Sequence, residues 1–136
     1  MALTKEDCKR IEQALDASDF AMVNLKIDGR EITLRWALKT RFERMVAILV
    51  DGEMESEWAE GGFPECKYWR VATGFAYSAK DRKTMKRMSI ASLKKRGLNP
   101  EERVTYYSPY FTSYKTLIAH LIRFDDAALT EVGSVL

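Results

Sequence analysis

The chain has 136 residues, of which 46% are hydrophobic and 31% are charged, and its formal net charge at pH 7 is +2. These values are typical of one globular domain that is long enough to bury a core, and they argue against a disordered chain. No apolar run approaches the roughly 18 residues that cross a membrane, and the charged N-terminal segment is unlike a secretory signal. We therefore expect a cytoplasmic protein with no membrane contact and with two reduced cysteines, Cys8 and Cys66.

Residues 5–17 are predicted to form a short amphipathic helix. Thr4 is suited to cap its N-terminus, and Asp7 stands three residues later as the reciprocal partner of a capping box. Four apolar or small residues then recur at helical spacing: Cys8, Ile11, Ala14 and Leu15. The helix is therefore expected to bury one stripe against the rest of the domain.

Two Asp-Gly dipeptides follow, each between two alternating runs, a pattern that favours β-hairpins with two-residue turns. The first, Asp28-Gly29, predicts these facing pairs: Ile27 with Arg30, Leu25 with Ile32, and Val23 with Leu34. The second, Asp51-Gly52, predicts three more: Leu49 with Met54, Ala47 with Ser56, and Met45 with Trp58. Together they predict a four-stranded antiparallel meander over residues 20–58, with one face on the core.

The segment 66–77 shows no clear period. It is compatible with a fifth strand of the meander or with a short helix, and the sequence leaves both alternatives open. Its large aromatic residues are expected in the core: Trp69, Phe75 and Tyr77.

A single helix of about 17 residues is predicted over residues 79–96. Ser78 and Asp81 form a capping pair at its start, and Gly97 is a natural C-terminal stop. Its apolar stripe is thin, with Met85 and Met88 as the only large apolar members. We expect this helix to dock on the protein through that stripe and to turn a basic row toward solvent.

The C-terminal part is predicted to hold a second helix and a tail. Tyr114 begins a clean helical period that ends at Ile122, and Thr112 or Ser113 is expected as its N-cap. The acidic residues 125–136 are weakly patterned and are expected to be a mobile tail. The predicted fold is thus α+β, with one domain over residues 1–124 and with both C-terminal helices packed on one face of the sheet.

Catalytic and cofactor motifs are missing from the sequence. The one histidine, His120, lies on a helix otherwise given to packing and is expected at the surface or at the edge of the core. Two separated cysteines with one histidine do not supply the four ligands of a structural zinc site. The glycines form no phosphate-binding loop. We therefore predict a protein that is not an enzyme and that needs no metal and no cofactor.

An acidic row follows the second Asp-Gly turn, with four members: Asp51, Glu53, Glu55 and Glu57. On a strand the three glutamates would share one face, about 6.6 Å apart. Three interpretations follow: a divalent metal site, a row of charges that imitates a nucleic-acid backbone, or a solvated edge strand. A linear row diverges where a metal needs converging ligands, and charged edge strands are common, so the last interpretation is favoured.

The basic helix is the stronger candidate for a binding site. Residues 80–96 hold eight lysines and arginines and one aspartate, so the rest of the chain sums to about −5. This concentration exceeds what solubility needs, and it suits either a polyanion or an acidic protein surface. The candidate residues are Lys80, Lys83, Lys86, Arg87, Lys94, Lys95 and Arg96, with Tyr110 nearby as a surface on which a base could stack.

The double Asp-Gly meander LKIDGREITLRWALK…MVAILVDGEMESEW, followed by the basic helix and then YYSPYFTSYKTLIAHL, resembles small accessory proteins of tailed bacteriophages and prophages. The resemblance implies a viral protein that acts in a bacterial cytoplasm, but it carries over no functional residues. It implies two functions. The first is nucleic-acid binding through the basic helix. The alternative is inhibition of a host defence or replication protein, as in anti-restriction or anti-CRISPR proteins, through the basic helix or through the acidic row.

Overall fold

The computed structural model describes residues 2–38, 41 and 43–134. Its elements are α1 (Lys5–Ala17), β1 (Ala21–Ile27), β2 (Arg30–Leu38), β3 (Arg44–Val50), the 3-10 helices η1 (Ser56–Glu60) and η2 (Pro64–Tyr68), β4 (Arg70–Phe75), α2 (Ala79–Met85), α3 (Ile90–Arg96), β5 (Arg103–Ser108), β6 (Tyr110–Phe111), α4 (Tyr114–Leu121) and β7 (Ala128–Ser134). The predicted α+β class is confirmed. Within the described residues, no helix is long and apolar enough to span a membrane.

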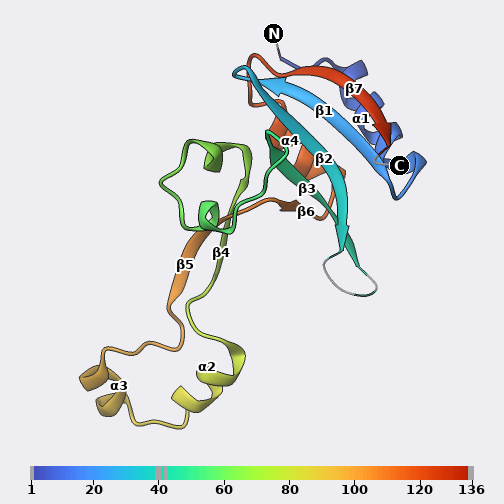
Figure 1. The fold of residues 1–136 in the computed structure, drawn as a ribbon. Helices are drawn as coiled ribbons and strands as arrows, with labels where there is room; N and C mark the ends of the chain where they lie inside the picture. Colours follow the sequence, from blue (N-terminus) through green and yellow to red (C-terminus); the bar gives the residue numbers. More distant parts are fainter. Residues whose placement is uncertain (1, 39–40, 42, 135–136) are drawn as a thin grey trace.

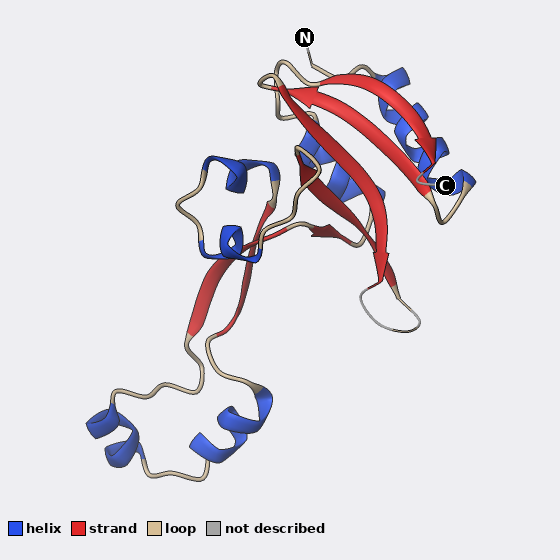
Figure 2. Cartoon of the chain, viewed as in Figure 1, coloured by secondary structure: helices blue, strands red, loops and turns tan. Residues whose placement is uncertain are grey.

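The chain is arranged as a base and an arm. The base contains a five-stranded antiparallel sheet in the order β6-β3-β2-β1-β7, and α1 and α4 cover one face of it (Figure 1). The arm, residues 70–108, is the two-stranded ribbon of β4 and β5, and it carries α2 and α3 at its far end (Figure 2). The arm projects away from the sheet.

The N-terminal helix and the first hairpin form as predicted. Thr4 and Asp7 make the reciprocal capping box of α1, with bonds of 3.0 and 3.1 Å. The first hairpin has the predicted register, with Ile27 facing Arg30. Its turn uses left-handed backbone at Asp28 and Gly29, with φ of 55° and 77°. On the face of β1 and β2 that the helices cover, Val23, Leu25, Ile32 and Leu34 are fully buried and Trp36 is half-buried.

The second hairpin turns as predicted, but its return strand was predicted wrongly. Asp51 and Gly52 adopt the expected left-handed turn, and pairing then stops after one bridge between Val50 and Glu53. The chain enters η1 instead, which turns Trp58 into the core. The place beside β3 is taken by β6, which pairs with Val46 and Ala47. Acidic residues are poor strand formers, so the glutamates after Gly52 favour a strand only weakly. Burial of Trp58 then determines the direction of the chain.

The single basic helix was also predicted wrongly. The chain leaves the helix after Met85 and starts a new one at Ile90, with Ser89 in extended conformation as its N-cap. The Ser89 hydroxyl accepts from the Ser92 backbone N–H at 3.1 Å, so it competes with helix continuation. Neither helix packs on the sheet, because both lie at the end of the arm (Figure 1). The segment 66–77, left open by the sequence, supplies the end of η2 and the strand β4.

The C-terminal segment, which we expected to be a mobile tail, forms β7 over Ala128–Ser134. β7 pairs antiparallel with β1, with a register shift at Asn24 and Leu25. Leu129 is half-buried and packs against the core. Residues 135–136 of the predicted tail lie outside the described residues. The last strand is therefore part of the sheet, and it completes the base.

A chain that ends at Ala127 is expected to be much less stable, because β1 then becomes an unpaired edge and Leu129 no longer covers the core. We expect several kcal/mol of loss from the about 5–15 kcal/mol of a typical domain. Urea titration followed by tryptophan fluorescence measures it. A matched deletion, with residues 78–100 replaced by a short glycine-serine turn, is expected to leave unfolding of the base nearly unchanged. Equal losses in the two variants would contradict this division into base and arm.

Candidate nucleic-acid interface

The tip of the arm, residues 76–102, is a concentrated region of positive charge. It contains eight lysines and arginines against three acidic residues, a net charge of +5. Because the whole chain has a net charge of +2, the remainder carries −3. The ribbon between tip and base is six residues long, or about 20 Å. The basic residues predicted as a binding site are therefore brought together, at a distance from the core.

All seven predicted basic residues are exposed. Lys86 lies 3.6 Å from the carboxylate of Glu101 and forms a weak surface pair with it. The other six have no ion pair with any residue that the structure describes: Lys80, Lys83, Arg87, Lys94, Lys95 and Arg96. Their charges are therefore available to a partner. The last three stand in the final turn of α3, where cations also interact favourably with the helix dipole.

The eighth basic residue, Arg82, has a structural role that the sequence did not reveal. Its guanidinium lies 3.3 Å from the ring centroid of Phe75, and Arg103 covers the same ring at 4.3 Å. Arg82 also donates from Nε to the Pro100 carbonyl oxygen at 2.9 Å. This stack joins α2 to both strands of the ribbon. Met85 is the one buried residue of the tip, so few other contacts orient it.

The tyrosines divide into structural and available rings. Tyr114 packs against Trp36 and donates to Asp16 at 2.6 Å; burial and this bond raise the pKa of Tyr114 to about 12. Tyr106 is 37% exposed, whereas Tyr107 and Tyr110 are half-buried at the root of the arm. The hydroxyls of these last three make no hydrogen bond with any described residue. Tyr110 lies at the root of the arm, and not at the tip with the basic residues.

The predicted acidic row is not a row. Glu53 forms one isolated β-bridge, with Val50. Glu55 comes directly before the 3-10 helix η1, and Glu57 lies in that helix, so no strand aligns the three glutamates. Asp51 is engaged elsewhere, accepting from Arg30 Nε at 2.9 Å and from the Glu31 backbone N–H at 3.0 Å. Arg30 holds the pKa of Asp51 below its usual value. The geometry thus gives no support to an acidic surface that imitates a nucleic acid.

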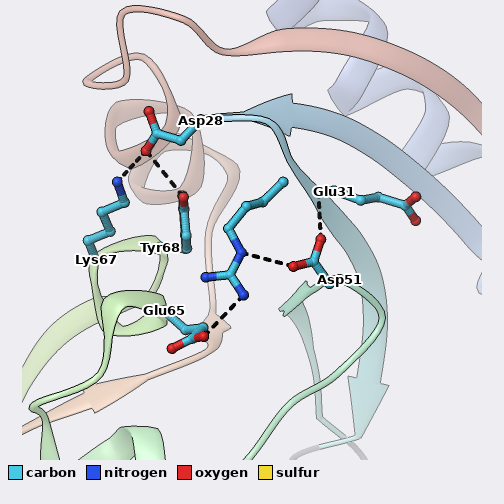
Figure 3. A network of polar contacts seen from close by, with 7 residues as sticks. Asp28, Glu31, Asp51, Glu65, Lys67 and Tyr68 are labelled. Carbon is cyan, nitrogen blue, oxygen red and sulfur yellow. Dashed lines mark hydrogen bonds and ion pairs between the residues drawn. The ribbon is translucent and has the colours of Figure 1, made fainter.

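Asp51 belongs to a polar network that fastens η2 to the two Asp-Gly turns (Figure 3). Arg30 also donates to Glu65 at 3.0 Å. Asp28 accepts from the Lys67 ammonium and from the Tyr68 hydroxyl, and Lys67 lowers the pKa of Asp28. The network pairs opposite charges around the turns. Among the described residues, no group of three or more histidine, cysteine or acidic side chains is arranged to hold a metal ion.

His120 was expected at the surface or at the edge of the core, and the expectation of a surface position was wrong. The side chain is buried between Phe111 and Phe124, with ring centroids at 5.3 and 5.5 Å. Its Nε2 lies 2.8 Å from the Tyr68 carbonyl oxygen, which only accepts, so Nε2 carries the proton. Burial lowers the pKa of His120, and the nearby Arg123 lowers it further. The histidine is a core residue that joins α4 to η2.

In comparisons with family models, with curated proteins and with solved structures, the chain matches none of them. The resemblance to phage accessory proteins therefore stays a prediction.

The aromatic stack at the neck of the tip can be tested by Phe75→Ala. We expect amide hydrogen exchange in α2 to accelerate about 5- to 30-fold, because two cation–π contacts are each worth about 0.5–1 kcal/mol at exposed sites. Amides of β1 and β2 should be unaffected. Val71→Ala is the matched control, since Val71 is 62% exposed on the same ribbon. Unchanged exchange in α2 would show that the stack does not orient the tip.

The buried histidine predicts a pH dependence of stability. The unfolded pKa is about 6.5 and the folded pKa lies below it, so protons bind preferentially to the unfolded state as pH falls below about 6.5. The free energy of unfolding should be level just above that pH and then decline by up to about 1.4 kcal/mol per pH unit, until the folded pKa is reached. Urea titrations between pH 7.5 and 5, over roughly one unit either side of the unfolded value, measure it. His120→Gln should remove the decline, and a slope that persists in this variant would contradict the assignment.

Proposed function

We propose that this protein binds nucleic acid through the tip of its arm and that it does so without catalysis. The observation that carries the proposal is the group of six exposed, unpaired cationic side chains at the end of the ribbon, set apart from a base of opposite net charge. Contacts to phosphate release counterions and need no sequence readout, so such a group is sufficient for affinity.

The architecture of the tip supports the same proposal. Two short helices separated by residues 86–89 carry the cations, whereas one straight helix presents a single row. The basic side chains take no part in the core of the base, so the fold does not account for their number. A two-stranded ribbon is marginally stable alone in water, so the exposed arm itself favours a role in contacting a partner.

The alternative function, inhibition of a host defence or replication protein, has two versions: one that binds through the acidic residues and one that binds through the basic tip. Its acidic version loses support because Asp51 is paired and the glutamates do not align. Its basic version, in which the tip docks on an acidic protein, uses the same side chains as the proposal. Binding to bare nucleic acid separates the two. If the phage resemblance holds, the partner belongs to a bacterial cytoplasm.

The test is binding to labelled single- and double-stranded DNA and RNA at 50 and 200 mM salt. We expect micromolar or tighter binding at the lower salt. Six phosphate contacts predict a slope of about −5 in log K against log[salt] on duplex DNA, a loss of about a thousandfold between these conditions. A variant with Lys80, Lys83, Arg87 and Lys94 changed to glutamine should lose most of the affinity and flatten the slope.

The matched control removes the same charge from the base, at four exposed lysines that form no ion pair with any described residue: Lys5, Lys9, Lys26 and Lys115. Changed to glutamine, these should leave the salt slope almost unaltered. Equal losses in the two variants would mean that overall charge, and not the tip, drives binding. No binding of any nucleic acid at 50 mM salt would overturn the proposal in favour of an acidic protein partner.

A further inference from the structure

A pocket lies at the root of the arm, where β5 passes into β6. It has a volume of about 400 Å³, and its lining includes Arg70, Tyr106, Tyr107 and Tyr110. A smaller, largely apolar cleft of about 240 Å³ adjoins it across Tyr110 and Pro109, with Trp69 in its wall. The larger volume falls within the range of small-ligand sites. Figure 1 shows this root, where the ribbon meets the sheet beside β6.

The chemistry of the walls points to an aromatic ligand that carries negative charge. Arg70 is half-buried, its Nε donates to the Tyr110 carbonyl oxygen at 2.5 Å, and its charge has no acidic partner among the described residues. A half-buried arginine without a carboxylate is suited to an anion, and guanidinium groups recognise phosphate well. The tyrosine rings beside it offer stacking surfaces, with hydroxyls that no described residue engages.

The same face of the ribbon leads from the pocket toward the basic tip. In the β4–β5 register Arg70 faces Ser108, Ala72 faces Tyr106, and Gly74 faces Val104, so these alternate residues share one face. The Tyr106 ring extends over Gly74, where a Cβ atom would lie 3.4 Å from its Cε1. Tyr106 therefore borders the pocket and also covers the ribbon on the way to the tip. Val104 continues this face and is 45% exposed.

We infer that the root pocket receives an unstacked base of single-stranded nucleic acid, whose phosphate lies at Arg70 and whose backbone follows this face of the ribbon to the tip. This inference rests on the proposed function and specifies its ligand. A paired duplex does not present a base face to the pocket without flipping it out. Stacking on tyrosine accepts any base, so little sequence preference is expected.

The test compares two strands of equal charge: a thymidine strand of about 12 nucleotides, and a fully abasic strand of the same length. This length covers the roughly 20 Å ribbon, since stacked nucleotides advance about 3.4 Å each. Both strands can contact the tip, but only the first can fill the pocket. We expect the thymidine strand to bind roughly 5- to 150-fold more tightly, the range that one stacked base provides.

Two pocket variants should reduce that ratio toward one without changing the salt slope. Tyr110→Leu keeps an apolar side chain but removes the ring. Tyr106→Ala changes a more exposed position, and it still tests the inference if Tyr110→Leu fails to fold. Phe20→Leu is the matched control, because Phe20 is 50% exposed on the base and does not line the pocket. Circular dichroism verifies the fold of each variant.

The outcomes separate the inference from the function on which it rests. If the two strands bind the unchanged protein equally, or if both pocket variants keep the full ratio, the pocket takes no base and the inference fails alone. If neither strand binds at low salt, the proposed function fails and the inference fails with it. A ratio that falls in the pocket variants but stays in Phe20→Leu supports both.

Discussion

The arm depends on the backbone of one residue, Ile48. Its N–H donates to the carbonyl oxygen of Pro109 at 3.0 Å, and its carbonyl oxygen accepts from the Trp69 indole at 3.0 Å. Trp69 comes directly before β4 and Pro109 directly after β5, so both ends of the arm are fastened at the same point of β3. Ile48 itself is fully buried, and a buried polar group that loses its partner costs about 1–3 kcal/mol. The position of the tip and the shape of the root pocket both follow from this attachment.

The attachment also explains why the base and the arm have different physical characters. Buried apolar side chains hold the base together, and several of its charged side chains form ion pairs around the two Asp-Gly turns. The tip has one buried methionine, and at the end of the ribbon beside it two arginines cover the ring of Phe75. Most of its lysines contribute nothing to folding that the structure reveals. Because the core of the base forms without these lysines, the ribbon can hold them at its far end, away from the base.

Local signals in the sequence were sufficient for some elements of the fold. The capping box at Thr4, the Asp28-Gly29 turn and the regular apolar period from Tyr114 each fix their element through neighbouring residues, and each was predicted correctly. The basic residues of the tip were likewise evident from charge alone. Ser89 was a readable N-cap signal within the predicted single helix, but the prediction used only the cap at Ser78 and the stop at Gly97.

The other elements of the fold depend on contacts between distant parts of the chain. Trp58 leaves the second hairpin because it packs edge-on against Trp69, with centroids 5.3 Å apart, and no local pattern indicates that contact. β7 is a strand because β1 offers a free edge. Arg70 and Phe75 stand in a segment without a period, and their roles appear only when β5 lies beside β4. The root pocket was therefore beyond sequence reasoning, although Tyr110 was named as a surface on which a base could stack.

The separation of charge along the arm gives the molecule an electric dipole, and salt determines how that dipole acts. In dilute buffer, where electrostatic forces extend over tens of ångströms, a polyanion exerts a torque that swings the tip, at +5, forward and the rest of the chain, at −3, back before contact. At physiological ionic strength the Debye length is about 8 Å, shorter than the roughly 20 Å ribbon. The partner then interacts only with the tip and its charge of +5. Neither the net charge of +2 nor the pI near 8.5 describes this interaction.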